Sequence, residues 1–210
     1  ATSAESSSTD SETDSNADSG SNNGKSGGFG GSGGFGGFGD LGGGMDEYCE
    51  QNQIVINGGT LYVNASGDGI DSNGDLIIND GQISVDGPVS GGDAPLDCGG
   101  SIYVNNSSVV AESLFPGLFA QADLSINGGS VKATSAKDSP IWARGDLTIY
   151  GGAKAELSGM YPSGCNGTFR VGLVDIDAKN TNQENIPAIA DNPVILDDYT
   201  LKTAVAVDSE

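Results

Sequence analysis

From about residue 48 onward, the chain consists of short stretches in which apolar and polar residues alternate. Gly, Asn and Asp residues separate these stretches, and no helical period persists. Strict alternation over a few residues is typical of a strand that buries one face and exposes the other. The pattern therefore predicts an all-β domain built from many short strands.

The alternating stretches belong to a repeated unit. IDSNGDLIINDGQISVDG (70–87) aligns with LDCGGSIYVNNSSVVAES (96–113), and LFAQADLSINGGSVKATS (118–135) aligns with IWARGDLTIYGGAKAELS (141–158). The upstream IVINGGTLYVNAS (54–66) matches the second half of the unit. Successive units start 22–26 residues apart, and a repeat of this kind is the signature of a solenoid.

The apolar positions of the unit explain why copies must stack. One copy cannot bury its apolar face alone, whereas stacked copies bury a continuous column. Short strands with Gly and Asn corners at this period predict a parallel β-helix. Hairpins in an antiparallel sandwich also use Asn-Gly corners, but they do not explain a full-unit repeat. The expected inward residues are Leu76, Ile78, Ile83 and Val85; Ile102, Val104, Val109 and Ala111; Leu124, Ile126, Val131 and Ala133; and Leu147, Ile149, Ala153 and Ala155.

The two ends of the chain differ from the repeat. Residues 1–28 contain no Val, Ile, Leu, Phe, Tyr or Trp, so burial cannot offset their ordering entropy. Residues 29–44 continue as Gly with spaced Phe, which is typical of a flexible spacer. We therefore expect a disordered, Ser/Asp-rich and Gly/Phe-rich segment over 1–47, β-helix rungs over 48–168, and irregular terminal rungs or a cap over 169–210. Alternatively, the phenylalanines of the Gly-rich stretch contact a sugar or the domain's own surface.

The net charge of the chain makes some classes of binding partner unfavourable. The chain has 29 acidic and 8 basic residues, a net charge of −21, and no basic residue between Lys25 and Lys132. Nucleic acids and anionic membrane surfaces are disfavoured because both need a basic footprint. No apolar run is long enough for a membrane-spanning helix, so we expect no membrane insertion. The abundance of Asn, Gly, Ser, Thr and Asp with few lysines suggests a secreted or cell-surface protein.

The chain contains no His, which excludes several kinds of catalytic and metal-binding site. Ser-His-Asp triads, imidazole bases and His-based zinc sites are excluded. The three cysteines, Cys49, Cys98 and Cys165, are too scattered for a zinc motif. One disulfide with a free thiol and three unpaired thiols both fit this spacing. The remaining metal chemistry uses oxygen ligands, which favours Ca²⁺.

Acidic residues recur at one position of the unit. Its third residue is Asp71, then Asp97, then Phe119, then Trp142. Stacking would place Asp71 and Asp97 on neighbouring strands about 4.8 Å apart. Two carboxylates at that spacing repel unless a cation lies between them. We predict bound Ca²⁺ there, although solvated turn-forming aspartates are the alternative. The candidate metal ligands are Asp68, Asp71, Asn73, Asp75, Asp93 and Asp97.

The basic residues offer few candidates for catalysis. Lys132, Lys137, Arg144 and Lys154 lie one or two units beyond the aspartates. A lyase would use one of them as its base, but each is also an ordinary surface charge. Trp142 and Arg144 are better candidates for contact with a sugar ring. We assign no catalytic residue, because carboxylates that hold Ca²⁺ stay ionised and suit binding better than acid catalysis.

The segment 57–111 resembles a family of secreted bacterial carbohydrate-binding β-helix proteins. The resemblance rests on GDGIDSNG (67–74), VDGPVSGG (85–92) and APLD (94–97), and GGFGGFGD (33–40) is similar to insertions found in the family. It implies a right-handed parallel β-helix related to pectate lyases, bound Ca²⁺, and binding of acidic pectin or cellulose. The chain departs from the family pattern at Cys98 and Phe119.

These observations lead to one expected function and two alternatives. We expect non-catalytic, calcium-dependent binding of plant cell-wall polysaccharide, either polygalacturonate or cellulose. Because the protein is acidic, polygalacturonate should need a bridging cation. The alternatives are a lyase acting on pectate, and a cell-surface adhesin or spacer whose calcium is structural.

Overall fold

The computed structural model describes residues 48–88, 93–182, 187–190, 193–196 and 200–205. All of them belong to the second of two compact units, Phe38–Glu210. The segment 1–47, for which the sequence predicts disorder, lies outside the described residues. In the described part of the chain, no helix is long and apolar enough to cross a membrane.

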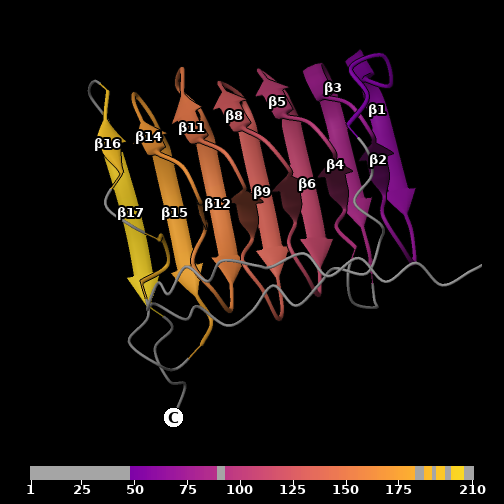
Figure 1. Cartoon of the computed structure of the whole chain (residues 1–210). Helices are drawn as coiled ribbons and strands as arrows, with labels where there is room; N and C mark the ends of the chain where they lie inside the picture. The colour runs from indigo at the N-terminus through magenta and orange to yellow at the C-terminus, as the bar shows by residue number, and fades with distance from the viewer. Residues whose placement is uncertain (1–47, 89–92, 183–186, 191–192, 197–199, 206–210) are drawn as a thin grey trace, which may run out of the picture. The chain divides into compact units, whose positions relative to one another are not determined.

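Strands account for most of the described chain (Figure 1). In chain order they are β1 (Ile54–Asn64), β2 (Ile70–Ser72), β3 (Leu76–Asp86), β4 (Leu96–Cys98), β5 (Ile102–Asn105), β6 (Ser108–Ser113), β7 (Leu118–Ala120), β8 (Leu124–Asn127), β9 (Ser130–Ser135), β10 (Ile141–Ala143), β11 (Leu147–Tyr150), β12 (Lys154–Gly159), β13 (Gly164–Cys165), β14 (Phe169–Val171), β15 (Asp175–Asn180), β16 (Val194–Ile195) and β17 (Thr200–Val205).

Every paired strand lies parallel to its neighbour one repeat away. The short strands form one sheet in the order β13-β10-β7-β4-β2. The longer strands form the other, in which β3 pairs with β5 through Leu76–Ile78 and with β6 through Gln82–Asp86. The chain is therefore an all-β parallel solenoid of about six turns, which confirms the predicted β-helix.

The core is a set of columns that run from rung to rung. Leu76, Ile102, Leu124, Leu147 and Phe169 are successive register partners, and all are buried. The residue that follows each of the three middle members, Tyr103, Ser125 or Thr148, points outward and is more exposed. The alternation seen in the sequence therefore separates a continuous apolar interior from the outward faces.

One part of the predicted register is wrong. The expected inward residues matched Val131 with Ala153 and Ala133 with Ala155, whereas the structure pairs Val131 with Ala155 and Ala133 with Leu157. The corner after Tyr150 is one residue longer than its equivalent in the preceding unit. Ala153 is buried in that corner instead of in the strand, and Leu157 supplies the larger core side chain.

The ladder continues beyond the residue at which the repeat fades in the sequence. β14 pairs with β11, and β15 pairs with β12 over Asp175–Asn180. Ile176 and Ala178 continue the buried columns. Parallel pairing therefore extends the rungs past residue 168.

A polar ladder connects the rungs at the corner that precedes the long strands. The Oδ1 of Asp75 accepts a hydrogen bond from Ser101 N (2.8 Å), and Ser101 Oγ accepts one from Asp123 N (3.2 Å). Asp123 Oδ1 then accepts from Asp146 N (2.7 Å), and Asp146 Oδ1 accepts from Thr168 N (2.8 Å). These side chains satisfy backbone N–H groups that would otherwise lack partners at the bend. We call this set, Asp75 to Thr168, the corner ladder.

Truncation of a core column should destabilise the whole stack. Ile126 is fully buried on β8 between Val104 and Ile149. We expect Ile126→Ala to lower the free energy of unfolding by about 2–5 kcal/mol, because it leaves a cavity in a column that cannot collapse. Chemical denaturation measures this loss. Ser125→Ala, an outward change on the same strand, should stay within about 0.5 kcal/mol, and equal losses for both variants would contradict the assigned orientation.

The corner ladder should make stability sensitive to acid. The N–H of Thr168 and then the guanidinium of Arg170, whose Nη1 lies 2.6 Å from Oδ2, hold the pKa of Asp146 below its ordinary value of 3.8. The stabilisation is therefore present above the ordinary value and is lost as pH falls through the lower folded pKa. We expect the Tm of Asp146→Asn to fall less between pH 5 and pH 2.5 than that of the wild type.

The control for this comparison is Asp177→Asn, which makes the same change in charge on the exposed face of β15. Its Tm should follow the wild-type pH profile. A parallel profile for Asp146→Asn would show that Asp146 gains nothing from Thr168 and Arg170 in the folded state.

Candidate functional site

The short-strand sheet carries one outward residue from each rung. Asp71, Asp97, Phe119, Trp142 and Gly164 are successive register partners on β2, β4, β7, β10 and β13. The residues before and after each of the first four point inward and are buried. We call this row the short-sheet column. It places two carboxylates side by side, as the repeat alignment predicts, and then two aromatic side chains.

Phe119 lies between Asp97 and Trp142 in the column. It is only 2% exposed, so its ring cannot offer a face to a ligand. The guanidinium carbon of Arg144 lies 5.6 Å from the centroid of this ring. Arg144 therefore makes a cation–π contact with Phe119. Arg144 is itself exposed and remains accessible at the edge of the column.

Trp142 is half-buried on β10 and lies beside a glycine in the next rung. A Cβ atom on Gly164 would come within 3.2 Å of Cζ3 of Trp142. The indole therefore lies close to the backbone of β13. A partly exposed indole on the same face as two carboxylates can contact a sugar ring while polar groups hold its hydroxyls.

Two of the predicted ligands lie in the loops that lead into the short sheet. Asp68 Oδ1 accepts a hydrogen bond from Ala94 N (2.7 Å). A Cβ atom on Gly67 would lie 3.6 Å from Oδ2 of Asp93. Asp68 and Asp93 therefore lie in the segments that lead into β2 and β4, on two neighbouring rungs.

The other two predicted ligands lie at the following corner. Asp75 belongs to the corner ladder, in which its Oδ1 accepts from Ser101. The backbone oxygen of Asn73 accepts from Cys49 N (2.9 Å). Both residues are half-buried. The six predicted ligands therefore extend over two rungs, from the loops before the short strands to the corner after them.

The donors suit a hard cation, but they do not form a complete protein cage. In the described part of the chain, no three His, Cys, Asp or Glu side chains gather closely enough to hold a metal ion. Asp71 and Asp97 supply carboxylate oxygens on neighbouring strands, and Ca²⁺ takes 6–8 oxygen ligands. The pair therefore fits Ca²⁺ if water or a ligand contributes most of the coordination. The calcium site stays a prediction.

The cysteines do not add to this chemistry. None of the three described cysteines forms a disulfide. Burial, with a smaller contribution from the neighbouring Asp97 carboxylate, raises the pKa of Cys98 to about 12. Its thiol is therefore neutral at physiological pH.

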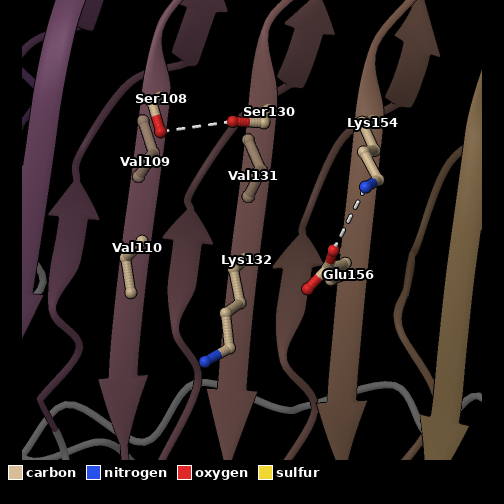
Figure 2. A pocket seen from close by; sticks show the side chains of 8 residues that line it. All are labelled: Ser108, Val109, Val110, Ser130, Val131, Lys132, Lys154 and Glu156. Atoms are coloured by element: carbon tan, nitrogen blue, oxygen red, sulfur yellow. Dashed lines mark hydrogen bonds and ion pairs between the residues drawn. The ribbon is translucent and has the colours of Figure 1, made fainter.

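A hollow lies on the long-strand sheet, over β6, β9 and β12 (Figure 2). It has a volume of about 300 Å³ and is lined by Ser108, Val109, Val110, Ser130, Val131, Lys132, Lys154 and Glu156. We call it the lysine groove. Sequence reasoning considered its lysines only as candidate bases and did not identify the groove. The sequence signal that could have identified the groove lies in the outward-facing residues of the second strand of each repeat.

Two ion pairs border the lysine groove. Lys132 Nζ lies 3.2 Å from Glu112 Oε1, and Lys154 Nζ lies 3.5 Å from Glu156 Oε1. The Oγ of Ser130 donates a hydrogen bond to the Oγ of Ser108 on the neighbouring rung (3.2 Å). In Figure 2 the ammonium of Lys132 is directed away from the Lys154–Glu156 pair. All four charged side chains are about half exposed, so solvent and ligands can reach them.

Comparison with known proteins identifies the family. The family model for carbohydrate-binding domain-containing proteins matches residues 44–160, more than half of the chain. The comparisons with curated proteins and with solved structures found no match. The matched segment includes the short-sheet column from Asp71 to Trp142 and all the residues that line the lysine groove. The chain belongs to the family of carbohydrate-binding domain-containing proteins.

Proposed function

We propose that this protein binds acidic plant cell-wall polysaccharide without cleaving it, and that Ca²⁺ joins the Asp71–Asp97 pair to the glycan. The observation that carries the proposal is the register of the short-sheet column. Asp71 and Asp97 are register partners, and the partly exposed Trp142 lies two strands further along the same row, beyond the buried Phe119. The proposed cation site and the proposed sugar-contact surface therefore lie in one row of side chains.

Charge supports a bridging cation. The net charge of −21 repels a polyanion such as polygalacturonate at long range. Two carboxylates on neighbouring strands also repel each other unless nearby groups compensate their charge. A divalent cation relieves both repulsions when the carboxylates of the protein and of the glycan ligate it together. The ion supplies charge neutralisation, while this chain's residues hold and orient it.

The other side chains of the column supply contacts that need no metal. Trp142 offers the exposed part of its indole to the apolar face of a sugar ring. Arg144 offers N–H donors to hydroxyls or carboxylates while Phe119 holds its guanidinium in place. A neutral glycan such as cellulose would use the indole without the cation, so a comparison of the two glycans separates these contributions.

Binding without catalysis fits both the family and the site. The family model describes carbohydrate binding. Acid–base cleavage requires a group that gives or takes a proton near neutral pH, whereas carboxylates that ligate a cation remain ionised. We further propose that the protein acts outside the cell, as its Asn-, Gly-, Ser- and Asp-rich composition suggests.

Removal of the acidic pair should abolish the calcium effect. In the double variant Asp71→Asn/Asp97→Asn, we expect calorimetry to show loss of Ca²⁺ binding and at least a tenfold loss of affinity for polygalacturonate in Ca²⁺. A chelator should cause a similar loss in the wild type. The matched control is Asp80→Asn/Asp86→Asn, which removes two carboxylates of β3 that lie outside the short sheet. Full affinity in chelator would contradict the bridging cation.

Trp142 is the only tryptophan of the chain, so its fluorescence reports directly on the column. We expect glycan binding to change its emission, because the ligand displaces water from the indole. Trp142→Ala should weaken glycan binding by about 1–2 kcal/mol, roughly five- to thirtyfold. Tyr150→Ala, an exposed aromatic change on β11, is the control and should bind normally. Saturable binding with unchanged emission would place the glycan elsewhere.

A further inference from the structure

We propose that the lysine groove is a second glycan-binding surface, which holds uronic-acid carboxylates directly through Lys132 and Lys154 and needs no metal ion. The inference rests on the proposed function, because it assigns to the same protein a further contact with acidic glycan. The groove lies on β6, β9 and β12 of the long-strand sheet, whereas the predicted cation site lies on the short-strand sheet.

The floor and walls of the groove follow from the register of the outward residues. Ser108, Ser130 and Lys154 form one row across the strands. Val110, Lys132 and Glu156 form the next row. Short side chains therefore occupy the β6 side, and long charged side chains rise from β9 and β12, which makes a polar trough open to solvent.

The trough extends over several rungs. A second hollow of about 140 Å³ is lined by Lys154, Ala155, Glu156, Asp175 and Asp177. It shares Lys154 and Glu156 with the first, so the two hollows adjoin at β12 and together extend from β6 to β15. Parallel strands lie about 4.8 Å apart, which is comparable with the length of one pyranose in an extended glycan. A short oligosaccharide that crosses the strands would therefore meet a new rung at about each sugar.

The charges of the groove select the ligand. Two of the eight basic residues, Lys132 and Lys154, line the groove on β9 and β12. The residues that line the two hollows include no aromatic side chain. Stacking on a sugar face is therefore not the means of recognition here, and charge and hydrogen bonds remain. Ammonium groups beside serine hydroxyls suit a carboxylated sugar.

The existing ion pairs do not block this use of the lysines. Lys132–Glu112 and Lys154–Glu156 are about half exposed, and such surface pairs contribute little free energy. A glycan carboxylate can therefore replace or share each glutamate at small cost. Asp175 and Asp177 make the β15 end acidic, so carboxylates bind toward β9 and that end accepts bonds from sugar hydroxyls.

The test measures binding of trigalacturonate, with cellotriose as the neutral ligand of the same length, in Ca²⁺ and in chelator. We compare the wild type with Lys132→Gln/Lys154→Gln. The matched control, Lys137→Gln/Lys179→Gln, removes the same charge from residues that do not line the groove. Thermal melts of all three proteins establish that the variants are folded.

In chelator, we expect the wild type to retain weak, salt-sensitive binding of trigalacturonate but not of cellotriose. Lys132→Gln/Lys154→Gln should lose about fivefold or more of this affinity, as expected for two exposed charged contacts, while the control should not. Equal binding by the two double variants would overturn the groove and leave the calcium proposal standing if Asp71→Asn/Asp97→Asn still loses affinity in Ca²⁺. No binding of either glycan by the wild type in Ca²⁺ or in chelator would overturn both.

Discussion

The structure depends on the in-register parallel pairing of strands that lie 22–26 residues apart in the chain. This pairing places each inward residue on its equivalent in the next rung, so a few apolar positions repeated along the chain become continuous buried columns. It places outward residues in rows in the same way. The chemistry of each face is therefore determined by which residue occupies one outward position in each repeat.

That constraint also determines where the aspartates lie. The buried neighbours Ile70 and Leu96 hold β2 and β4 in register, so Asp71 and Asp97 are register partners on the outward face. The core therefore determines where the two carboxylates lie, and this is the place at which we propose that a cation binds. The corner ladder uses aspartates differently, because Asp123 and Asp146 satisfy backbone N–H groups of the next rung. The position of an aspartate in the repeat therefore decides its role. Aspartates of the corner ladder are structural, whereas those of the short-sheet column are candidates for ligand binding.

The repeat in the sequence was enough to predict the solenoid, the buried columns and the neighbours Asp71 and Asp97. It did not predict the register after Tyr150, because one extra corner residue moves Leu157 into the column. Nor did it show that Asp75 bonds the backbone of the next rung, since such a bond depends on the bend between rungs. The lysine groove was missed because repeats are aligned by their apolar residues, whereas grooves are built from the outward residues between them.

The most direct test of the central claim is the thermal unfolding of the wild type and of Asp71→Asn/Asp97→Asn with Ca²⁺, with polygalacturonate, and with both together. A ligand that binds only the folded state raises Tm by linkage. The account predicts that Ca²⁺ raises the Tm of the wild type, that polygalacturonate raises this Tm clearly more in Ca²⁺ than in chelator, and that Ca²⁺ causes neither increase in the variant. Equal increases in wild type and variant, or an increase with polygalacturonate that persists undiminished in chelator, would contradict a glycan held through a cation at the stacked aspartates.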